Sequence, residues 1–551
     1  MVLADKIFSS QSVFTGLQDH AQPGAIALKD NKIIATGSIE EMKAFIGPNT
    51  KEFDFGDRTI MPGFHDAHLH IMLGALLIHG SVDLSDAISS GDAIEKVKEF
   101  ADQRPNDEWI IGYGWDHLSW GEDFPNRFII DQAVIDRPVL LFHAELHYAW
   151  VNSKALKTAG VTSETENPSN GKIQKDEDGE PTGILIETAT SLVADVGLAM
   201  SKQDLQGLLE AFLQETARLG ITSVNDLYQS SVEQMHGPDI FHLFKEFDEA
   251  ERLTTRIHLY PVLDGNIEEA KDMKKTFDSG KLKISGLKQF IDGVVTSHTA
   301  YMLDPYVDKP ETKGNTALPK EVIRRRALQA DKEGFQIRFH AIGDGAVSFG
   351  LDVFEEAQKI NGVRDSRHAL EHIEVIHPND ISRLKALGVI PSIQPAHLAL
   401  MPKESHTTRV KKEKHPYLYT CKSLQGEEIK VSFGTDFPVT VLNPMLEIYY
   451  AVNRLDYTGE NVWNAQEKLS VAEALKAYTS GSAYSVFRED ELGTLEEGKL
   501  ADIVVLDENI FKIPRENIAD VKVAMTVVDG KIVFQKSNSS TSEHYRAKAE
   551  R

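Results

Sequence analysis

The sequence predicts an α/β protein, built as a (β/α)8 TIM-like barrel with a small discontinuous β-sandwich domain formed by both chain termini. Two observations carry this prediction: β-prone segments alternate with helical patterns through the middle of the chain, and hairpin signatures stand at its two ends. The chain is also large enough, because 41% of its 551 residues are hydrophobic and can fill a sizeable core. An open doubly wound sheet is the competing arrangement, since the repeated strand–helix order fits both.

The two ends of the chain resemble each other. Each carries two β-prone segments that flank a short turn, and the turn near the end is Asp529-Gly530. We therefore expect residues 1–57 and 491–535 to form the two parts of one β-domain. The last residues, 536–551, are rich in Ser, Lys and Glu and are predicted to be a flexible tail.

Residues 58–490 are predicted to form the barrel, with inserts. Most of the β-prone segments are followed by a helical pattern, which favours parallel strands joined by crossover helices. Two polar inserts, 163–182 and 401–416, are predicted as surface loops, and the second could cover an active site. The expected strands are 59–64, 139–142, 220–226, 282–290, 335–340, 368–374, 389–394 and 431–436, and the expected helices include 205–219, 319–333, 345–359, 378–387 and 470–480.

The composition narrows the class of protein. With 59 basic and 84 acidic residues the net charge is −25, and so acidic a chain repels nucleic acids and anionic membranes. The single cysteine, Cys421, excludes an internal disulfide framework and a CxxC metal site, and is typical of a reducing compartment. We see no signal peptide and no apolar run near the roughly 20 residues that span a bilayer. We expect a soluble, cytoplasmic protein that binds neither nucleic acid nor membrane.

The sharpest motif is the pair His68 and His70, just after the first expected strand. On an extended segment, side chains two positions apart point to the same side. Two imidazoles on one side can bind a single divalent cation, and imidazole suits zinc, iron or nickel. The pair therefore predicts a metal site at the end of this strand.

Four more segments place metal-compatible residues in or at the ends of later strands. These residues are Lys288, His340, His372 and Asp436. In a barrel the carboxyl ends of all strands meet on one face, where catalytic groups gather. Residues hundreds of positions apart are therefore expected to form one site.

In these motifs the sequence resembles the amidohydrolase superfamily of metal-dependent hydrolases. Its closest resemblance is to the branch that includes N-substituted formamide deformylases. The resemblance spans roughly residues 5–535 and keeps the order of the motifs. They are Pro62-Gly63-Phe64 with His68 and His70, Lys288–Gly293, His340–Asp344, Glu371-His372, Gln394–His397, Gly434–Pro438 and Leu492–Asp502.

The resemblance implies one or two divalent metal ions, with zinc as the first candidate. By the family pattern, His68, His70 and Asp436 hold one ion, and His340 and His372 hold the other. Lys288 bridges the two ions once its amine has captured carbon dioxide to give N6-carboxylysine, since a carbamate is anionic and offers two oxygens. The resemblance also makes a homodimer possible.

The implied chemistry is hydrolysis of a C–N bond. A bound divalent ion lowers the pKa of its water and produces hydroxide near neutral pH. Asp436 takes the proton of that water and passes it to the departing amine. The favoured substrate is a small linear amide, an N-acyl or N-formyl amine. The alternatives are a cyclic-amide hydrolase or a deaminase on the same scaffold, and a metal-bound protein with a purely binding or regulatory role.

Further candidates for the pocket come from the same motifs. The resemblance implies that His147 faces the substrate carbonyl, although Glu145-Leu146 stands where relatives often carry Asp-Gly. His397 is a candidate for the pocket lining. Four aromatic residues are candidate walls for an apolar group of the substrate: Trp115, Trp150, Phe290 and Tyr301.

Overall fold

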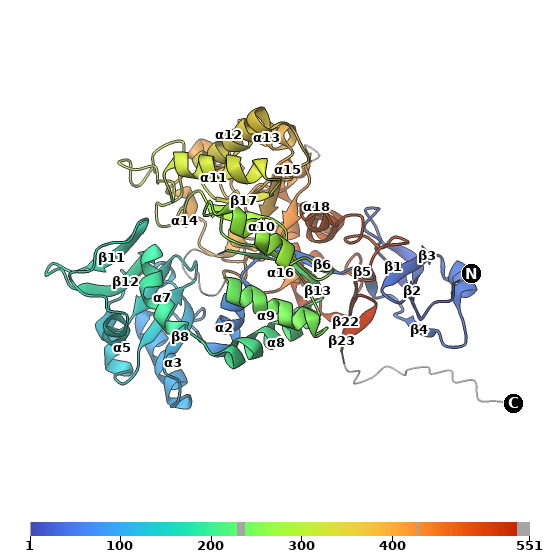
Figure 1. The fold of residues 1–551 in the computed structure, drawn as a ribbon, viewed down its shortest axis with the longest axis horizontal. Helices are drawn as coiled ribbons and strands as arrows, with labels where there is room; N and C mark the ends of the chain where they lie inside the picture. Colours follow the sequence, from blue (N-terminus) through green and yellow to red (C-terminus); the bar gives the residue numbers. More distant parts are fainter. Residues whose placement is uncertain (1, 229–236, 427–428, 537–551) are drawn as a thin grey trace.

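The computed structural model describes residues 2–228, 237–426 and 429–536, and these form an α/β protein with four sheets. Figure 1 shows the sheet of the two chain ends at one end of the molecule, where strands from the start and from the end of the chain form one sheet. Parallel sheets occupy the middle, and an inserted sheet lies on the other side. Among the described residues, none of the helices is both long and apolar enough to span a bilayer.

Both ends of the chain contribute to one eight-stranded sheet. Its order is β23-β22-β21-β5-β1-β2-β3, and β4 pairs with β1. The antiparallel pair β5–β21 joins the two ends of the chain. That they form a two-layered sandwich remains a prediction, and the predicted tail lies outside the described residues apart from Lys536. The strands are β1 (Lys6–Val13), β2 (Gln22–Lys29), β3 (Lys32–Gly37), β4 (Lys51–Asp54), β5 (Thr59–Pro62), β21 (Ile503–Leu506), β22 (Val523–Val528) and β23 (Lys531–Gln535).

Two parallel sheets form the middle of the molecule. One has the order β15-β14-β13-β6 and the other β16-β17-β18-β19-β20. Isolated parallel bridges, Leu69–Phe437 and Val262–Lys288, connect them. Closure into a barrel remains a prediction. The strands are β6 (Phe64–Leu69), β13 (Ile221–Leu227), β14 (Arg256–Tyr260), β15 (Leu282–Ile284), β16 (Leu287–Phe290), β17 (Ile337–Ala341), β18 (Ala369–His372), β19 (Ile390–Ile393) and β20 (Ser432–Phe433).

Helices follow the parallel strands, as the alternating pattern predicted. The helix before β13 shows why: Ser201 caps its start, and Gly220 ends it with a φ of +77°, which favours glycine. The helices are α1 (Ile39–Met42), α2 (Ile71–Gly80), α3 (Ser90–Gln103), α4 (His117–Trp120), α5 (Arg127–Ala133), α6 (Ser153–Thr158), α7 (Ser191–Gly197), α8 (Lys202–Leu219), α9 (Pro238–Glu249), α10 (Ile267–Thr276), α11 (Lys320–Lys332), α12 (Asp344–Asn361), α13 (Pro378–Leu387), α14 (Glu404–Thr407), α15 (Lys422–Gly426), α16 (Pro444–Asn453), α17 (Val471–Lys476) and α18 (Ser482–Ser485).

The third unit is an inserted six-stranded sheet of order β11-β12-β10-β9-β8-β7. It corrects two predictions. The strand predicted at 139–142 lies in this sheet and not in the parallel sheets, and the insert 163–182, predicted as a loop, contains β11. The strands are β7 (Val82–Asp83), β8 (Ile110–Trp115), β9 (Val139–His143), β10 (Tyr148–Val151), β11 (Gly171–Lys175) and β12 (Pro181–Glu187).

A buried ion pair joins the sheet of the chain ends to the parallel strands. Arg256, at the start of β14, donates to Asp502 over 2.8 Å and to Asp529 over 2.6 Å. The side chain of Arg256 is buried, so removal of its acidic partners would leave the charge of the guanidinium uncompensated in the interior. The ion pair lies at the start of the parallel strand β14, and the predicted site lies at the opposite ends of the parallel strands.

Candidate metal centre

One pocket gathers the predicted site residues at the ends of the parallel strands. His68 lies in β6 and His70 directly after it, while Asp436 follows β20. Strands far apart in the sequence therefore bring these side chains together, as expected of parallel strands. The predicted residues that line this pocket are His68, His70, His147, Lys288, His340, His372, His397 and Asp436.

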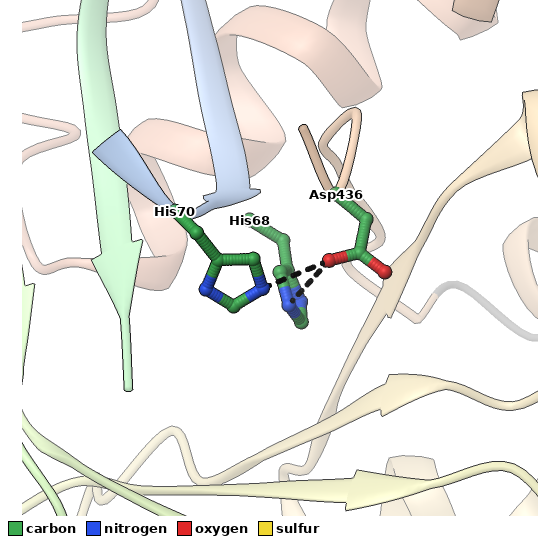
Figure 2. Close-up of side chains that lie close together, drawn as sticks. All are labelled: His68, His70 and Asp436. Carbon is green, nitrogen blue, oxygen red and sulfur yellow. Dashed lines mark hydrogen bonds and ion pairs between the residues drawn. The ribbon is translucent and has the colours of Figure 1, made fainter. Parts of the chain in front are cut away.

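Asp436 is the centre of the first group. Its Oδ1 lies 3.2 Å from Nε2 of His68 and 3.1 Å from Nε2 of His70. Figure 2 shows the two imidazoles converging on this single carboxylate oxygen. The three side chains are buried, and their ligand atoms are close enough together to share one metal ion.

A second group shares the same carboxylate. Oδ2 of Asp436 lies 3.5 Å from Nε2 of His397 and 3.8 Å from Nδ1 of His372. These residues also form a buried set that can hold an ion. The ring of His340 lies beside that of His372, with centroids 4.6 Å apart. Two neighbouring sites that share Asp436 are therefore possible.

Partners outside the pocket fix the orientation of four imidazoles. In each ring Nδ1 faces an oxygen that can only accept, so Nδ1 carries the proton and Nε2 keeps a lone pair in the neutral form. The four pairs are His68 with Glu371 at 2.6 Å, His70 with the Leu227 carbonyl at 2.7 Å, His340 with Asp292 at 3.1 Å and His372 with the Gln394 amide oxygen at 3.0 Å.

The charge states of the site suit metal binding. Burial lowers the pKa of His340 and of His372 well below the usual value, so both rings are neutral ligands. Burial alone would raise the pKa of Asp436, but the adjacent His68 and His70 hold it well below its usual range. Neutral imidazoles and an ionised carboxylate are the forms in which these side chains bind metals. His68 differs: burial lowers its pKa, but the charges of Asp436 and Glu371 raise it above the usual value, so an ion would displace a proton there.

Lys288 is buried beside this group, in β16. Its Nζ has no hydrogen-bond partner among the described residues, and it lies 5.3 Å from the centre of the Phe290 ring. Burial lowers the pKa of the amine to about 8. The neutral amine, which is the nucleophilic form, is therefore accessible near neutral pH.

Comparison with known families decides how the chain is classified. It matches the Amidohydrolase family over residues 51–534, which is most of its length. The chain belongs to the amidohydrolase family. It is therefore a hydrolase of a family that generally depends on divalent metal ions and acts on small molecules, and the predicted resemblance is confirmed.

Relatives of this amidohydrolase cover nearly its whole length. It is 30% identical to Protein LONG AFTER FAR-RED 3 of Arabidopsis thaliana, over 97% of this chain and 92% of the relative. It is 30% identical to the putative amidohydrolase YtcJ of Bacillus subtilis (strain 168), over 95% and 98%. It is 24% identical to the N-substituted formamide deformylase of Arthrobacter pascens, over 94% and 95%.

A solved structure gives the same picture of the fold. An uncharacterized metal-dependent hydrolase from Pyrococcus horikoshii OT3 is 25% identical to this amidohydrolase, with a TM-score of 0.74. The similarity covers 93% of this chain and 99% of that one. The arrangement of the sheets is therefore that of a metal-dependent hydrolase.

His147 lies in the pocket wall of this amidohydrolase, after a strained turn. Leu146 has a φ of +58°, a left-handed conformation that glycine adopts freely and that is strained for leucine. Nδ1 of His147 donates to Glu187 over 2.8 Å. Burial alone would lower the pKa of His147, but the charge of Glu187 raises it to about 9, so the ring is cationic at neutral pH.

The aromatic candidates separate into two sets. Phe290 lines the pocket and stacks on His340, with ring centroids 4.7 Å apart. Trp115 and Trp150 lie in the core of the inserted sheet instead, and Tyr301 packs at the edge of the main core. Of the four, the structure supports only Phe290 as a wall of the pocket.

Carboxylates that the motifs did not single out support the site. Glu374 lies 3.6 Å from His397 and 2.8 Å from His406. His406 belongs to the insert 401–416 and is buried beside Glu374, whereas Glu404 and Lys412 of the same insert are exposed, as predicted for a surface loop. Two of these carboxylates, Glu371 and Asp292, belong to motifs of the family resemblance, and Glu374 lies next to one. The sequence did not indicate their contacts with histidines, which only the structure shows.

A further buried group, Asp116, His117 and His143, could also hold a metal by distance alone. Here, however, Nδ1 of His143 accepts a hydrogen bond of 3.1 Å from the backbone N–H of Glu145. The proton of the neutral ring is therefore on Nε2, which faces Asp116 at 3.4 Å. This tautomer is the opposite of the one in the metal-compatible rings, so the contact of a protonated Nε2 with Asp116 accounts for the group.

Proposed function

We propose that this amidohydrolase cleaves the C–N bond of a linear N-acyl or N-formyl amine with the help of one or two divalent metal ions, zinc first among them. One observation carries the proposal. His68 and His70 both direct Nε2 at Oδ1 of Asp436, while Nδ1 of each is committed to another oxygen. Burial lowers the pKa of His68, but the charges of Asp436 and Glu371 raise it above its usual value, so a proton on Nε2 can also serve this contact. A divalent cation would take the place of such protons between the two Nε2 atoms and the carboxylate.

The ligand sets follow the family pattern. His68, His70 and Asp436 would hold one ion, and His340 and His372 the other, with Lys288 as the bridge after carboxylation to N6-carboxylysine. The unpartnered, buried amine of Lys288 supports this role. An ammonium would repel two cations, whereas a carbamate supplies two anionic oxygens.

The proposal includes the arrangement that carries the site. We place a closed (β/α)8 barrel at 58–490, on the support of the bridges Leu69–Phe437 and Val262–Lys288. Residues 1–57 and 491–535 would be the two parts of the β-sandwich domain. The free thiol of Cys421 is buried and fits a cytoplasmic location.

A divalent ion held by His68, His70 and Asp436 would act as a Lewis acid, which would lower the pKa of water and polarise a carbonyl oxygen. Asp436 accepts the proton of the attacking water on its carboxylate and delivers it to the departing amine nitrogen. His147, held by Glu187, donates a hydrogen bond from Nε2 to the carbonyl oxygen as negative charge develops there.

Free-amine release from a panel of N-formyl and N-acetyl alkylamines tests this function. The protein is assayed metal-stripped and after zinc is restored, with metal content measured in each sample. We expect turnover of these amides only in the metal-loaded protein. If the loaded protein hydrolyses no linear amide, the proposed substrate class is wrong.

A further inference from the structure

Glu145 is a buried carboxylate that the proposed mechanism does not use. It lines the pocket next to His147, and only 9% of its surface is exposed. Apolar side chains line the same pocket, among them Val294, Leu400 and Val439. Glu145 therefore places an acceptor for hydrogen bonds in a wall that is otherwise suited to a carbon chain.

The hydrogen bonds of Glu145 leave it poorly compensated. Both of its carboxylate oxygens accept from the Thr296 hydroxyl, at 2.8 and 2.7 Å, so one proton serves two oxygens. The nearest ring nitrogen, Nδ1 of His143, is 4.0 Å away and is itself an acceptor. In the described part of the chain, no lysine or arginine forms an ion pair with Glu145. A buried carboxylate without a strong donor is costly.

The other two carboxylates that line the pocket, Asp436 and Glu374, each lie beside the ring nitrogen atoms of two histidines. Asp436 faces His68 and His70, and Glu374 faces His397 and His406. The cation closest to Glu145 along the chain, His147, directs its Nδ1 to Glu187 instead. Burial lowers the pKa of His147, but the charges of Glu187 and of Glu145 both raise it, so two carboxylates share this one cation.

The backbone holds Glu145 in place. The N–H of Ala144 donates to the Trp115 carbonyl over 3.1 Å, and the N–H of Leu146 donates to the His143 carbonyl over 2.9 Å. With the N–H of Glu145 bonded to His143, three successive amides are fixed. A carboxylate on so rigid a turn is preorganised to accept a further hydrogen bond beside the one from Thr296.

We propose that Glu145 binds an ammonium group of the substrate, so that the preferred amides carry a second, cationic nitrogen at the far end of a short carbon chain. This inference rests on the proposed function for the amide bond itself. It adds that the pocket selects its substrate by charge. The scissile amide lies over Asp436, and the ammonium group gives Glu145 a charged hydrogen-bond donor.

The test compares pairs of substrates in the metal-loaded protein. Mono-N-formyl diaminoalkanes with two to six carbons are paired with N-formyl alkylamines of equal length that end in a methyl group. We expect kcat/KM to favour the cationic member of the best pair by about 10- to 100-fold, the usual range for a hydrogen bond to a charged group. Glu145→Gln should lower this ratio at least tenfold, and Glu145→Asp should keep part of it.

A matched control is Glu321→Gln, which removes one exposed carboxylate from α11 and should leave the ratio at its wild-type value. The inference is overturned if the wild type shows no preference, or if Glu145→Gln lowers kcat/KM equally for both members of each pair. The second result would assign Glu145 a structural role only.

Binding of free diaminoalkanes, measured by calorimetry, separates this inference from the proposed function. If no amide is hydrolysed but these diamines bind the wild type at least tenfold more tightly than Glu145→Gln, the ammonium site stands and the proposed reaction fails. If amides are hydrolysed while diamines bind both proteins equally, the reaction stands and the ammonium site is refuted.

Discussion

Oε2 of Glu371 lies 2.6 Å from Nδ1 of His68, although 303 positions separate the two residues. The other oxygen of Glu371 accepts from the buried Arg338 over 2.5 Å. The guanidinium keeps Glu371 ionised, and Glu371 in turn keeps the proton of His68 on Nδ1. The lone pair of Nε2 then points into the pocket, towards Asp436. Such an outer carboxylate both aims a histidine ligand and raises its basicity.

Glu371→Gln should therefore weaken metal binding by about 10- to 100-fold, the usual effect of losing an outer partner of a histidine ligand. Competition with a chelator measures the change. Asp331→Asn is a matched control, because Asp331 also pairs a buried histidine, His368, with an arginine, Arg364, away from the pocket. The control should lower stability and leave metal affinity as in the wild type. Equal metal affinity in Glu371→Gln would exclude this role.

Asp436→Asn separates metal binding from proton transfer. The amide keeps an oxygen for the ion but cannot take up a proton, so we expect most of the metal to remain and kcat to fall by about 10²- to 10⁴-fold. Metal analysis and single-turnover kinetics measure the two effects. Near-normal turnover in this variant would show that another group is the base.

Lys288→Ala tests the bridging carbamate. We expect the metal content to fall towards half, because the second ion loses its anionic ligand, and activity to fall with it. Short carboxylic acids should restore part of the activity by supplying two oxygens in the same place. Lys283→Ala, in the neighbouring β15, removes a lysine that pairs with Asp278 and should change neither quantity. A full complement of metal in Lys288→Ala contradicts the bridge.

The sequence predicted most of the parallel strands. The segment 59–64, expected as the first barrel strand, lies mainly in β5 of the chain-end sheet, and the expected strand 282–290 is divided into β15 and β16. Two further failures have a physical reason. The apolar run 139–142 reads as a buried strand in any sheet, and periodicity does not tell which sheet it joins. The strand β14, by contrast, was missed because Arg256 and His258 interrupt its apolar pattern. Both are buried, and the partners of Arg256, Asp502 and Asp529, lie more than 240 positions away.

The same limit applies to the site. His68 and His70 could be predicted because their spacing alone places both rings on one side of a strand. The contact of Glu374 with His397 and His406 depends on how the insert 401–416 folds over the pocket, and no local pattern encodes that. The proposed role of Glu145 depends on the hydrogen-bond donors that surround its carboxylate. They come from segments far away in the sequence, such as Thr296, and only the folded chain brings them together.

The pair His147–Glu187 makes stability depend on pH. The pKa of His147 is raised to about 9 in the folded chain from an ordinary value near 6.5, so folding takes up a proton between these values. This contribution is complete below about pH 6.5 and is lost as the pH rises through about 9. Its size is about 3 kcal/mol, since one pKa unit corresponds to about 1.4 kcal/mol and the side chain is buried.

Glu187→Gln should remove this dependence. We expect the wild type to exceed the variant in free energy of unfolding at pH 6, and the advantage to shrink steadily between pH 7 and pH 9.5. Denaturant unfolding of both proteins across this range, at equal metal content, measures it. The pH dependence is what identifies a charge pair, because a neutral hydrogen bond lost in the variant would lower stability equally at every pH. Parallel profiles would therefore mean that His147 is neutral in the folded protein and cannot act as a cationic donor to the substrate carbonyl.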